Sequence, residues 1–423
     1  MPSIHASPAR ACGIDFGTSN STVGWLRPGQ RTLLTLEDGK PSLPSVVFFN
    51  AEADTVSVGR NGLDEYLAGT EGRLMRSLKS LLGSSLIDGR TEVNGRAIVF
   101  RDLLKEFIGT LKARAENEAG RRFEQAVFGR PVFFVDNNPA ADQQAENTLG
   151  EIAHAIGFKD ISFQFEPIAA AYHYETQIQR EKIVLIADIG GGTSDFSIVR
   201  LSPERAKATD RRSDVLANGG IHIGGTDFDR QLSLAGVMPH LGYRSTLKNG
   251  REMPASIYFN LATWHTINFA YTRQVWSDQQ RLYIDALEPE RLERLLTLIE
   301  NRAGHWLAHQ VEQAKIALSA NDEATLRLDA FAPGEMHTLS RLEFELASTQ
   351  LVEKIESTVA SLLPTAGIAA ERIDTVFFTG GSSGIPALRE RIAAQLPKAQ
   401  AVEGDLFGSI GAGLAVDAAR RFA

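Results

Sequence analysis

The chain has 423 residues, of which 43% are hydrophobic and 23% are charged, and these values are ordinary for a globular protein. The composition excludes collagen-like, disordered and disulfide-rich classes, and at roughly 100–200 residues per domain the length predicts several domains. The 44 Lys and Arg residues against 52 Asp and Glu residues give a net charge of −8, which argues against a nucleic-acid partner or an anionic membrane surface.

Three further features predict a cytoplasmic protein. The single cysteine, Cys12, cannot form a disulfide within the chain and is expected to be a small core residue. The N-terminal segment shows no apolar run of signal-peptide length. The most apolar run, residues 183–187, is far shorter than the ~20 residues that a membrane-spanning helix needs.

The first half of the chain predicts alternating strands and helices. Apolar residues at helical spacing predict helices at 102–120 and 142–156. Pro131 is expected at the edge or at a bulge of its strand, because proline lacks the N–H that a central strand donates. Strands are predicted at 11–15, 21–26, 45–50, 97–100, 126–135 and 160–165.

The second half repeats this alternation around a long helical stretch. Strands are predicted at 183–189 and 196–201, and a mostly helical region follows from about 228 to 319. A late strand at 373–379 runs into a glycine cluster, a helix begins near Pro386, and residues 407–420 form a closing helix.

An internal repeat is the most informative feature. Residues 14–19 (IDFGTS) and 187–194 (ADIGGGTS) each combine a strand, an aspartate and a tight turn rich in Gly, Thr and Ser, followed by a second strand. A duplication of this size predicts two similar lobes that face each other across a cleft.

The two turns have the chemistry of a phosphate site. Glycines allow close approach of the backbone, and successive N–H groups with Thr or Ser hydroxyls bind anions. Asp15 and Asp188 would repel a phosphate, so they fit a Mg²⁺ ion, which accepts one or two carboxylates. Either turn alone is more simply a glycine-rich hairpin, whereas the pair favours a bound Mg-nucleotide. The cluster at 379–384 is either a nucleoside contact or a plain connection.

At these residues the chain resembles the nucleotide-binding domain of the heat-shock protein 70 (DnaK-like) family, which has an actin-like α/β ATPase fold. Within that family it is most similar to the short YegD-type chaperones, which consist of this domain only. The ordered motifs that carry the resemblance are 13–21 (GIDFGTSNS), 44–47 (PSVV), 77–83 (SLKSLLG), 166–170 (EPIAA), 186–195 (IADIGGGTSD), 224–229 (GGTDFD), 312–315 (EQAK) with Ser319, and 380–381 (GG).

The resemblance implies ATP or ADP with Mg²⁺ as ligands and a role for each matching residue. Asp15 and Asp188 would flank the metal, and Lys79, Glu166, Asp188 and Thr193 would be the catalytic residues. The other matches would hold the nucleotide: Gly17, Thr18, Ser19, Asn20, Gly190, Gly191, Gly192, Gly224, Gly225, Glu312, Lys315, Ser319, Gly380, Gly381, Ser382, Gly384 and Asp405.

The resemblance also implies a division of the chain. Lobe I is expected at 1–181 with an outer subdomain at about 38–110. Lobe II is expected at 182–423 with an outer subdomain at about 227–318, and a final helix at 405–423 crosses back to the cleft.

Three departures from the family pattern qualify this expectation. Gly384 stands where the family commonly has an arginine that stacks on adenine. The sequence ends at Ala423, where the linker and peptide-binding domain of the family would follow. The segment 229–312 is longer than usual and rich in aromatic residues, for which buried packing is the expected explanation and a partner surface the alternative.

The leading functional expectation is a slow ATPase of chaperone type, a monomer whose nucleotide state sets the angle between its lobes for a client or co-chaperone. Two alternatives remain open: a small-molecule kinase on the same fold, and a nucleotide-binding scaffold with negligible turnover. His305 and His309 have a spacing that suits a metal ion, but a structural role is expected for them.

Overall fold

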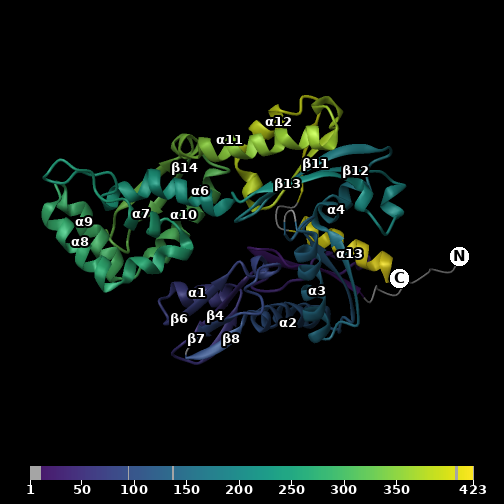
Figure 1. Cartoon of the computed structure of the whole chain (residues 1–423), viewed down its shortest axis with the longest axis horizontal. Helices are drawn as coiled ribbons and strands as arrows, with labels where there is room; N and C mark the ends of the chain where they lie inside the picture. The colour runs from purple at the N-terminus through teal and green to yellow at the C-terminus, as the bar shows by residue number, and fades with distance from the viewer. Residues whose placement is uncertain (1–10, 94, 136–137, 405–407, 423) are drawn as a thin grey trace.

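The computed structural model describes residues 11–93, 95–135, 138–404 and 408–422. Within them, two five-stranded sheets form the centres of two bodies (Figure 1). The first sheet has the order β10 (Asp160–Phe165), β9 (Gln125–Arg130), β1 (Ala11–Asp15), β2 (Asn20–Gly24), β3 (Ser42–Pro44). The second has the order β13 (Val215–Ile221), β12 (Ser194–Leu201), β11 (Lys182–Ile189), β16 (Thr375–Thr379), β17 (Gln400–Glu403).

The two sheets repeat one strand arrangement. In the first, β1 pairs antiparallel with β2 through the turn at 16–19 and parallel with β9. In the second, β11 pairs antiparallel with β12 through the turn at 190–193 and parallel with β16. The sequence repeat therefore folds into the same three-strand unit twice, with one glycine-rich turn at the end of each leading strand.

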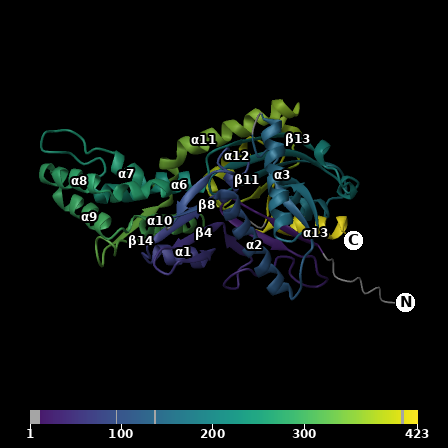
Figure 2. The ribbon, with the colours of Figure 1, turned by 60° about the horizontal axis from the view of Figure 1, so that its bottom comes forward.

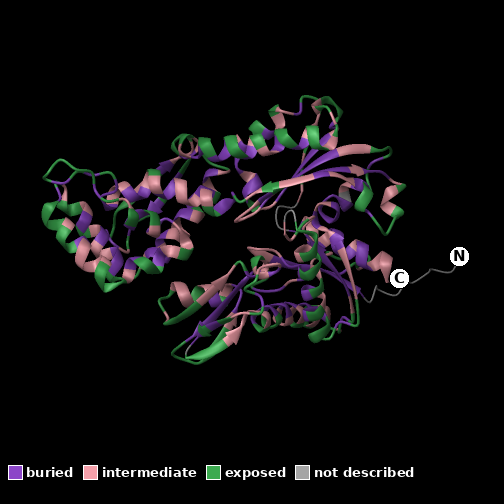
Figure 3. Ribbon diagram, in the orientation of Figure 1, coloured by how far each residue is buried: buried purple, intermediate pink, exposed green. Residues whose placement is uncertain are grey.

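Amphipathic helices cover both sheets, whose central strands are largely buried (Figure 3). In α2 the buried residues Leu103, Leu104, Phe107, Ile108 and Leu111 recur at helical spacing, which explains why this segment is a helix. The helices of these layers are α2 (Phe100–Ala119), α3 (Pro139–Ala155), α4 (Glu166–Ala170), α5 (Tyr172–Glu175), α11 (Arg341–Ala366) and α12 (Pro386–Ala394). None of the described helices is both long and apolar enough to span a membrane.

A small mixed unit extends from the first sheet, and we call residues 46–99 the first outer unit. It contains a three-stranded sheet of order β5-β4-β6 and a separate β7–β8 hairpin. Its elements are β4 (Val46–Asn50), β5 (Thr55–Val58), α1 (Arg60–Leu67), β6 (Gly72–Arg76), η1 (Leu78–Leu81), β7 (Arg90–Val93) and β8 (Arg96–Val99).

A larger helical unit extends from the second sheet, and we call residues 225–340 the second outer unit. Its helix α10 comes close to α1 of the first outer unit (Figure 2), where Tyr66 and His305 are in contact. Its elements are α6 (Gly225–Leu232), η4 (Ser233–Val237), η5 (Met238–Leu241), α7 (Ser256–Leu261), η6 (Trp264–Tyr271), α8 (Arg273–Asp285), α9 (Pro289–Glu300), α10 (Gly304–Leu318), β14 (Glu323–Arg327) and β15 (Met336–Ser340).

The aromatic-rich part of the second outer unit is only partly core. Ile257 and Tyr258 are buried, as expected from their sequence, and contribute to the main core of this unit. Phe269, however, is 60% exposed, so the expectation of buried packing is wrong for this residue.

Two predicted elements differ from the structure at their ends. β9 stops at Arg130, so the strand predicted at 126–135 is too long. The Arg130 guanidinium donates to the carbonyl oxygens of Pro131 and Val132, which turns the chain away from the sheet. The closing helix α13 spans Ser409–Arg421, and residues 405–407, expected at its start, lie outside the described residues.

Helix α13 follows the last strand of the second sheet but packs on the first. A Cβ at Gly13 of β1 would lie 2.3 Å from the backbone nitrogen of Ala415, and one at Gly413 would lie 1.9 Å from the Ala169 carbonyl oxygen of α4. Both positions require glycine because the backbones are in direct contact. The helix that closes the chain therefore joins the two bodies.

We predict that Gly413→Ala lowers the free energy of unfolding by about 2–3 kcal/mol, because the added methyl group forces α13 away from α4. The matched control is Gly150→Ala within α3, where a Cβ meets only the ring of Phe163 at 3.9 Å. This control is expected to stabilise the protein by about 0.5–1 kcal/mol, since alanine is the better helix former. Chemical denaturation measures both. Equal stability of the two variants would contradict the close packing of α13.

Candidate functional site

Two carboxylates lie at equivalent places in the two sheets. Asp15 is the last residue of β1, and Asp188 is the penultimate residue of β11. Burial, followed by the charge of Glu166, raises the pKa of Asp15 to about 7. Burial also raises the pKa of Asp188 to about 8, with further contributions from Asp195, Glu166 and Asp15. The floor of the site is therefore a carboxylate cluster in which negative charge is unfavourable unless a cation is close.

Lys79 supplies one such cation from the first outer unit. Lys79 is the second residue of η1. Ser77, which precedes η1, has a φ of 56° in the left-handed region and turns the chain sharply after β6. The Lys79 Nζ donates to Oε1 of Glu166 at 2.5 Å, and both side chains are largely buried. Burial lowers the pKa of Lys79, but the charges of Glu166 and Asp15 outweigh it and hold this pKa above its ordinary value. The ammonium group is therefore kept protonated.

The second glycine-rich turn is held by hydrogen bonds to its carbonyl groups. The Gly190 N–H donates to the Thr193 carbonyl and closes the turn. The Gly190 carbonyl accepts from the Gly225 N–H and from the Ser382 hydroxyl, and the Gly191 carbonyl accepts from the N–H and hydroxyl of Thr226. Three glycine clusters that are distant in sequence are thereby brought together around one turn.

The first turn is anchored by Ser45, which lies between β3 and β4. The Ser45 hydroxyl donates to the Gly17 carbonyl at 2.7 Å, and the Ser45 N–H donates to the Ser19 carbonyl at 2.9 Å. Residues 17–20 remain partly exposed at the inner face of the site.

The two turns touch each other. A Cβ built on Gly191 would lie 2.1 Å from the Ser19 hydroxyl oxygen, so no side chain fits at this position without displacing Ser19. Gly224 is equally constrained, because its Cβ would lie 2.6 Å from the backbone of both Gly191 and Gly192. The two turns thus form a narrow cradle in which no Cβ fits at Gly191 or at Gly224.

A lysine–aspartate pair lies on the far side of the second turn. Lys315 of α10 is buried, and its Nζ lies 2.8 Å from an oxygen of Asp229 and donates to the Gly225 carbonyl at 3.1 Å. Gly380 approaches from the end of β16 with a φ of 80°, and a Cβ there would lie 2.5 Å from an Asp188 oxygen. Lys315 and Gly380 are therefore part of the same assembly as the turns.

This donor set fits a Mg-nucleotide. Among the described residues no group of three or more His, Cys, Asp or Glu side chains is arranged to hold a metal ion. Mg²⁺ does not require such a group, because it is bound by one or two carboxylates and completes its shell with phosphate oxygens and water. Asp15 and Asp188 supply two carboxylates whose pKa values are raised by burial and by neighbouring carboxylates, so a cation bound between them would relieve unfavourable negative charge, and the cradle supplies backbone N–H groups for phosphate.

The structure places the remaining predicted residues with less direct contacts. The Thr193 hydroxyl donates to Asp195 across the turn at 2.9 Å. Ser319 directly follows α10, and its hydroxyl donates to the Lys315 carbonyl at 3.4 Å. Glu312 lies 3.6 Å from the His309 ring. Gly381 is exposed and Gly384 partly buried in the short helix η8 (Gly381–Gly384), and Asp405 lies outside the described residues.

Two carboxylates of the site are absent from the residues predicted from sequence. Asp229 pairs with Lys315, and Asp195 contacts Thr193 and adds negative charge near Asp188. Each is the last residue of a motif already noted, 224–229 and 186–195 respectively. Their place at the end of those motifs was the available signal, and only the fold shows which groups they face.

A family model described as Hsp70 protein matches residues 11–235 and 294–419. The matched ranges include both glycine-rich turns, both carboxylates, Lys79, Glu166, Lys315 and the cluster at 380–384, and they leave out 236–293 of the second outer unit. Members of this family are ATPases of actin-like fold that bind ATP or ADP with Mg²⁺. The α/β structure with its duplicated sheets agrees with that fold, and the chain belongs to the Hsp70 family.

Proposed function

We propose that this chain is a slow Mg²⁺-dependent ATPase that acts as a nucleotide-dependent switch of chaperone type. The single observation that carries the proposal is the contact of the two glycine-rich turns directly above Asp15, Asp188 and the Lys79–Glu166 pair. Phosphoryl transfer needs little covalent chemistry from a protein, since positioning and charge stabilisation account for most of the rate. A rigid cradle, one buried ammonium group and a group that orients water are sufficient for it.

Each of these residues has a distinct task in the proposal. Lys79 stays protonated and places its positive charge toward the terminal phosphate. Glu166 fixes the Lys79 ammonium through Oε1, which leaves Oε2 to accept a hydrogen bond from the attacking water. Asp15 and Asp188 hold Mg²⁺, which neutralises charge on the phosphates when it is bound. The N–H groups of 17–20 and 190–193 orient the phosphates.

The proposal includes a protein partner, either a client or a co-chaperone, whose binding depends on the angle between the two lobes. It also includes a monomeric chain. Three exposed apolar residues of the second outer unit support a partner surface: Phe269 is 60%, Ile284 68% and Leu287 58% exposed. Exposed apolar side chains mark a contact surface where they form one contiguous patch. A cytoplasmic setting fits the buried free thiol of Cys12, whose pKa is raised by burial.

We predict that Lys79→Ala and Asp188→Asn each lower ATP hydrolysis by about 10²–10³-fold, because each removes one charge contact to the transition state. Phosphate release in the presence of Mg²⁺ and without any added acceptor measures the activity. The control is Lys182→Ala, which removes a lysine at the far end of β11 and should leave the rate unchanged. Wild-type turnover in Lys79→Ala, with nucleotide still bound, would refute the assignment.

The same assay separates the alternative functions. Release of phosphate by the unmodified chain supports the ATPase. Transfer to a sugar with no release in its absence would instead indicate a small-molecule kinase, and binding without turnover would indicate a scaffold.

We predict that Gly384→Arg tightens ATP binding several-fold and widens the preference for ATP over GTP. Gly384 lies on η8 beside Ser382, which bonds the second turn, so an arginine here is near enough to stack on the base. Hydrolysis per bound ATP should stay nearly constant, since the phosphate contacts come from the turns. The matched control is Ala394→Arg, which adds the same charge at the exposed end of α12.

Calorimetric titration with ATP and with GTP measures the effect. Unchanged affinity of Gly384→Arg for both nucleotides would mean that another side chain already covers the base. An equal increase in ATP affinity for Ala394→Arg would mean that the added positive charge, and not stacking on the base, strengthens binding.

A further inference from the structure

Four arginines lie on two neighbouring loops of the first body, and the proposed reaction uses none of them. Arg27 and Arg31 belong to the loop 25–32, which follows β2. Arg121 and Arg122 belong to the short connection between α2 and β9. We call Arg27, Arg31, Arg121 and Arg122 the arginine cluster.

The two loops meet at Trp25, the first residue after β2. The guanidinium carbon of Arg27 lies 5.0 Å from the centre of the Trp25 ring, and that of Arg121 lies 5.3 Å from it. Trp25 is buried and packs edge to face on Phe123 at 5.5 Å. Because contact with an aromatic ring orients a planar guanidinium group, both cations are held in a defined position.

Hydrogen bonds hold both loops in place. The Trp25 N–H donates to the Thr32 carbonyl at 2.7 Å and closes the loop 25–32. The Arg27 Nη2 donates to the Arg31 carbonyl at 3.0 Å, so this guanidinium group lies beside the backbone that carries the next arginine of the cluster. On the second loop, the Arg121 N–H bonds back to the last turn of α2.

The arginine cluster has no negative counter-charge within the part of the chain that the structure describes. None of its four members forms an ion pair there, and the Nε atoms of Arg27 and Arg121 are buried without a hydrogen-bond partner. Glu116 and Glu124, on either side of the second loop, pair with lysines instead, and Glu118 is exposed. Buried polar groups are normally paired, so this arrangement calls for an acceptor.

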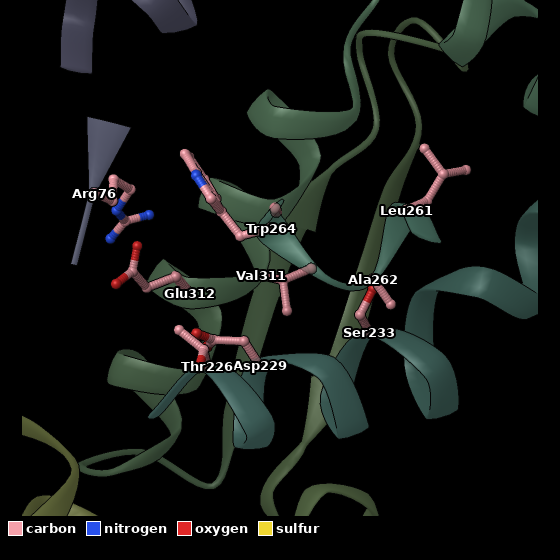
Figure 4. Close-up of a pocket in the computed structure, with 10 residues that line it drawn as sticks. Arg76, Thr226, Asp229, Ser233, Leu261, Ala262, Trp264, Val311 and Glu312 are labelled. Carbon is pink, nitrogen blue, oxygen red and sulfur yellow. The ribbon is translucent and has the colours of Figure 1, made fainter. Parts of the chain in front are cut away.

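Another arginine–tryptophan contact of the same chain includes such an acceptor. The Arg76 guanidinium lies over the Trp264 ring at 4.4 Å, and Figure 4 shows it turned toward the carboxylate of Glu312. Burial lowers the pKa of Arg76, while the charges of Glu312 and Asp229 raise it. Trp25 carries two arginines and the described residues supply no carboxylate to either, so an anion from outside the chain would complete the arrangement.

The arginine cluster is separate from the nucleotide site. The first glycine-rich turn precedes β2 and Trp25 follows it, so the two lie at opposite ends of a five-residue strand. At about 3.4 Å per residue this strand is roughly 17 Å long. A ligand bound at the arginine cluster is therefore distinct from the nucleotide in the cleft.

The charge of the whole chain restricts the kind of anion. A net charge of −8 repels an extended anionic surface such as a membrane or a nucleic acid. A compact polyphosphate concentrates its charge within a few ångströms, so a small group of guanidinium groups can meet it without bringing it over the acidic surface around them. Planar guanidinium groups also match the spacing of phosphate oxygens.

We propose that the arginine cluster binds a compact polyphosphate group, to which Arg27 and Arg121 donate hydrogen bonds through their terminal nitrogen atoms. Arg31 and Arg122 add positive charge beside it. Free inorganic polyphosphate and small phosphorylated compounds both carry such a group. The proposal goes beyond the ATPase function and does not depend on it.

Isothermal titration calorimetry of the full chain with inorganic tripolyphosphate tests the proposal. The wild type should bind, and Arg27→Ala combined with Arg121→Ala should lower the affinity about a hundredfold, a factor of ten for each lost guanidinium group. The matched control, Arg251→Ala combined with Arg273→Ala, removes two exposed arginines of the second outer unit and should bind as the wild type does. Any tripolyphosphate bound by the glycine-rich turns is the same in both double variants, because neither changes a residue of the cleft.

A second double variant, Arg27→Lys combined with Arg121→Lys, decides the case if the alanine variant does not fold. It keeps both charges and most of the packing but lacks the planar guanidinium group, so it should bind tripolyphosphate about tenfold more weakly. Wild-type affinity in the lysine variant, or an equal loss in the Arg251 and Arg273 control, would overturn the proposal.

A vesicle experiment tests the choice of a compact ligand. Vesicles of phosphatidylcholine and phosphatidylserine should not bind the chain, since its net charge opposes an anionic surface. Vesicle binding that disappears when Arg27 and Arg121 are replaced would overturn the compact ligand and indicate a membrane surface.

Discussion

The Ser19 hydroxyl of the first glycine-rich turn lies so close to Gly191 of the second that no side chain fits at position 191. Much of the remaining site depends on this contact. The carbonyl groups of Gly190 and Gly191 are bonded by α6 and by Ser382, which fixes the second turn in place against the first. A charged ligand that bridges the turns therefore contacts both sheets at once, and its loss or conversion changes the force between them.

Electrostatics makes the site dependent on its ligand. One ammonium group, that of Lys79, faces three carboxylates, those of Asp15, Glu166 and Asp188. Burial makes unbalanced charge costly, which is why the pKa values of Asp15 and Asp188 rise. A ligand that carries a bound cation restores the charge balance, so its binding stabilises the arrangement that brings these carboxylates together. Such coupling is a physical requirement of any nucleotide-driven switch.

Local chemistry could be predicted from sequence, and distant contacts could not. The strands on either side of each turn follow from short apolar runs that end at an aspartate, and the repeat indicated that they form twice. The contact of Tyr66 with His305 spans 239 residues and has no sequence pattern. Arg211 and Glu175 form a fully buried ion pair, although charged residues are expected at the surface. The β9 strand ended early because Arg130 bonds the chain beyond it.

The packing of α13 determines how the two bodies can move. Asp417 of α13 accepts from Gln164 of β10, whereas Arg420 donates to the carbonyl oxygens of Ala206 and Ala208, which follow β12. Backbone contact at Gly13 and at Gly413 fixes α13 to β1 and to α4. Any rotation between the bodies would therefore pass through the contacts of Arg420 with the second body. A rotation displaces each atom in proportion to its distance from the axis, so the outer units act as long lever arms. A small change of angle at the glycine-rich turns would become a large displacement where Tyr66 of α1 contacts His305 of α10.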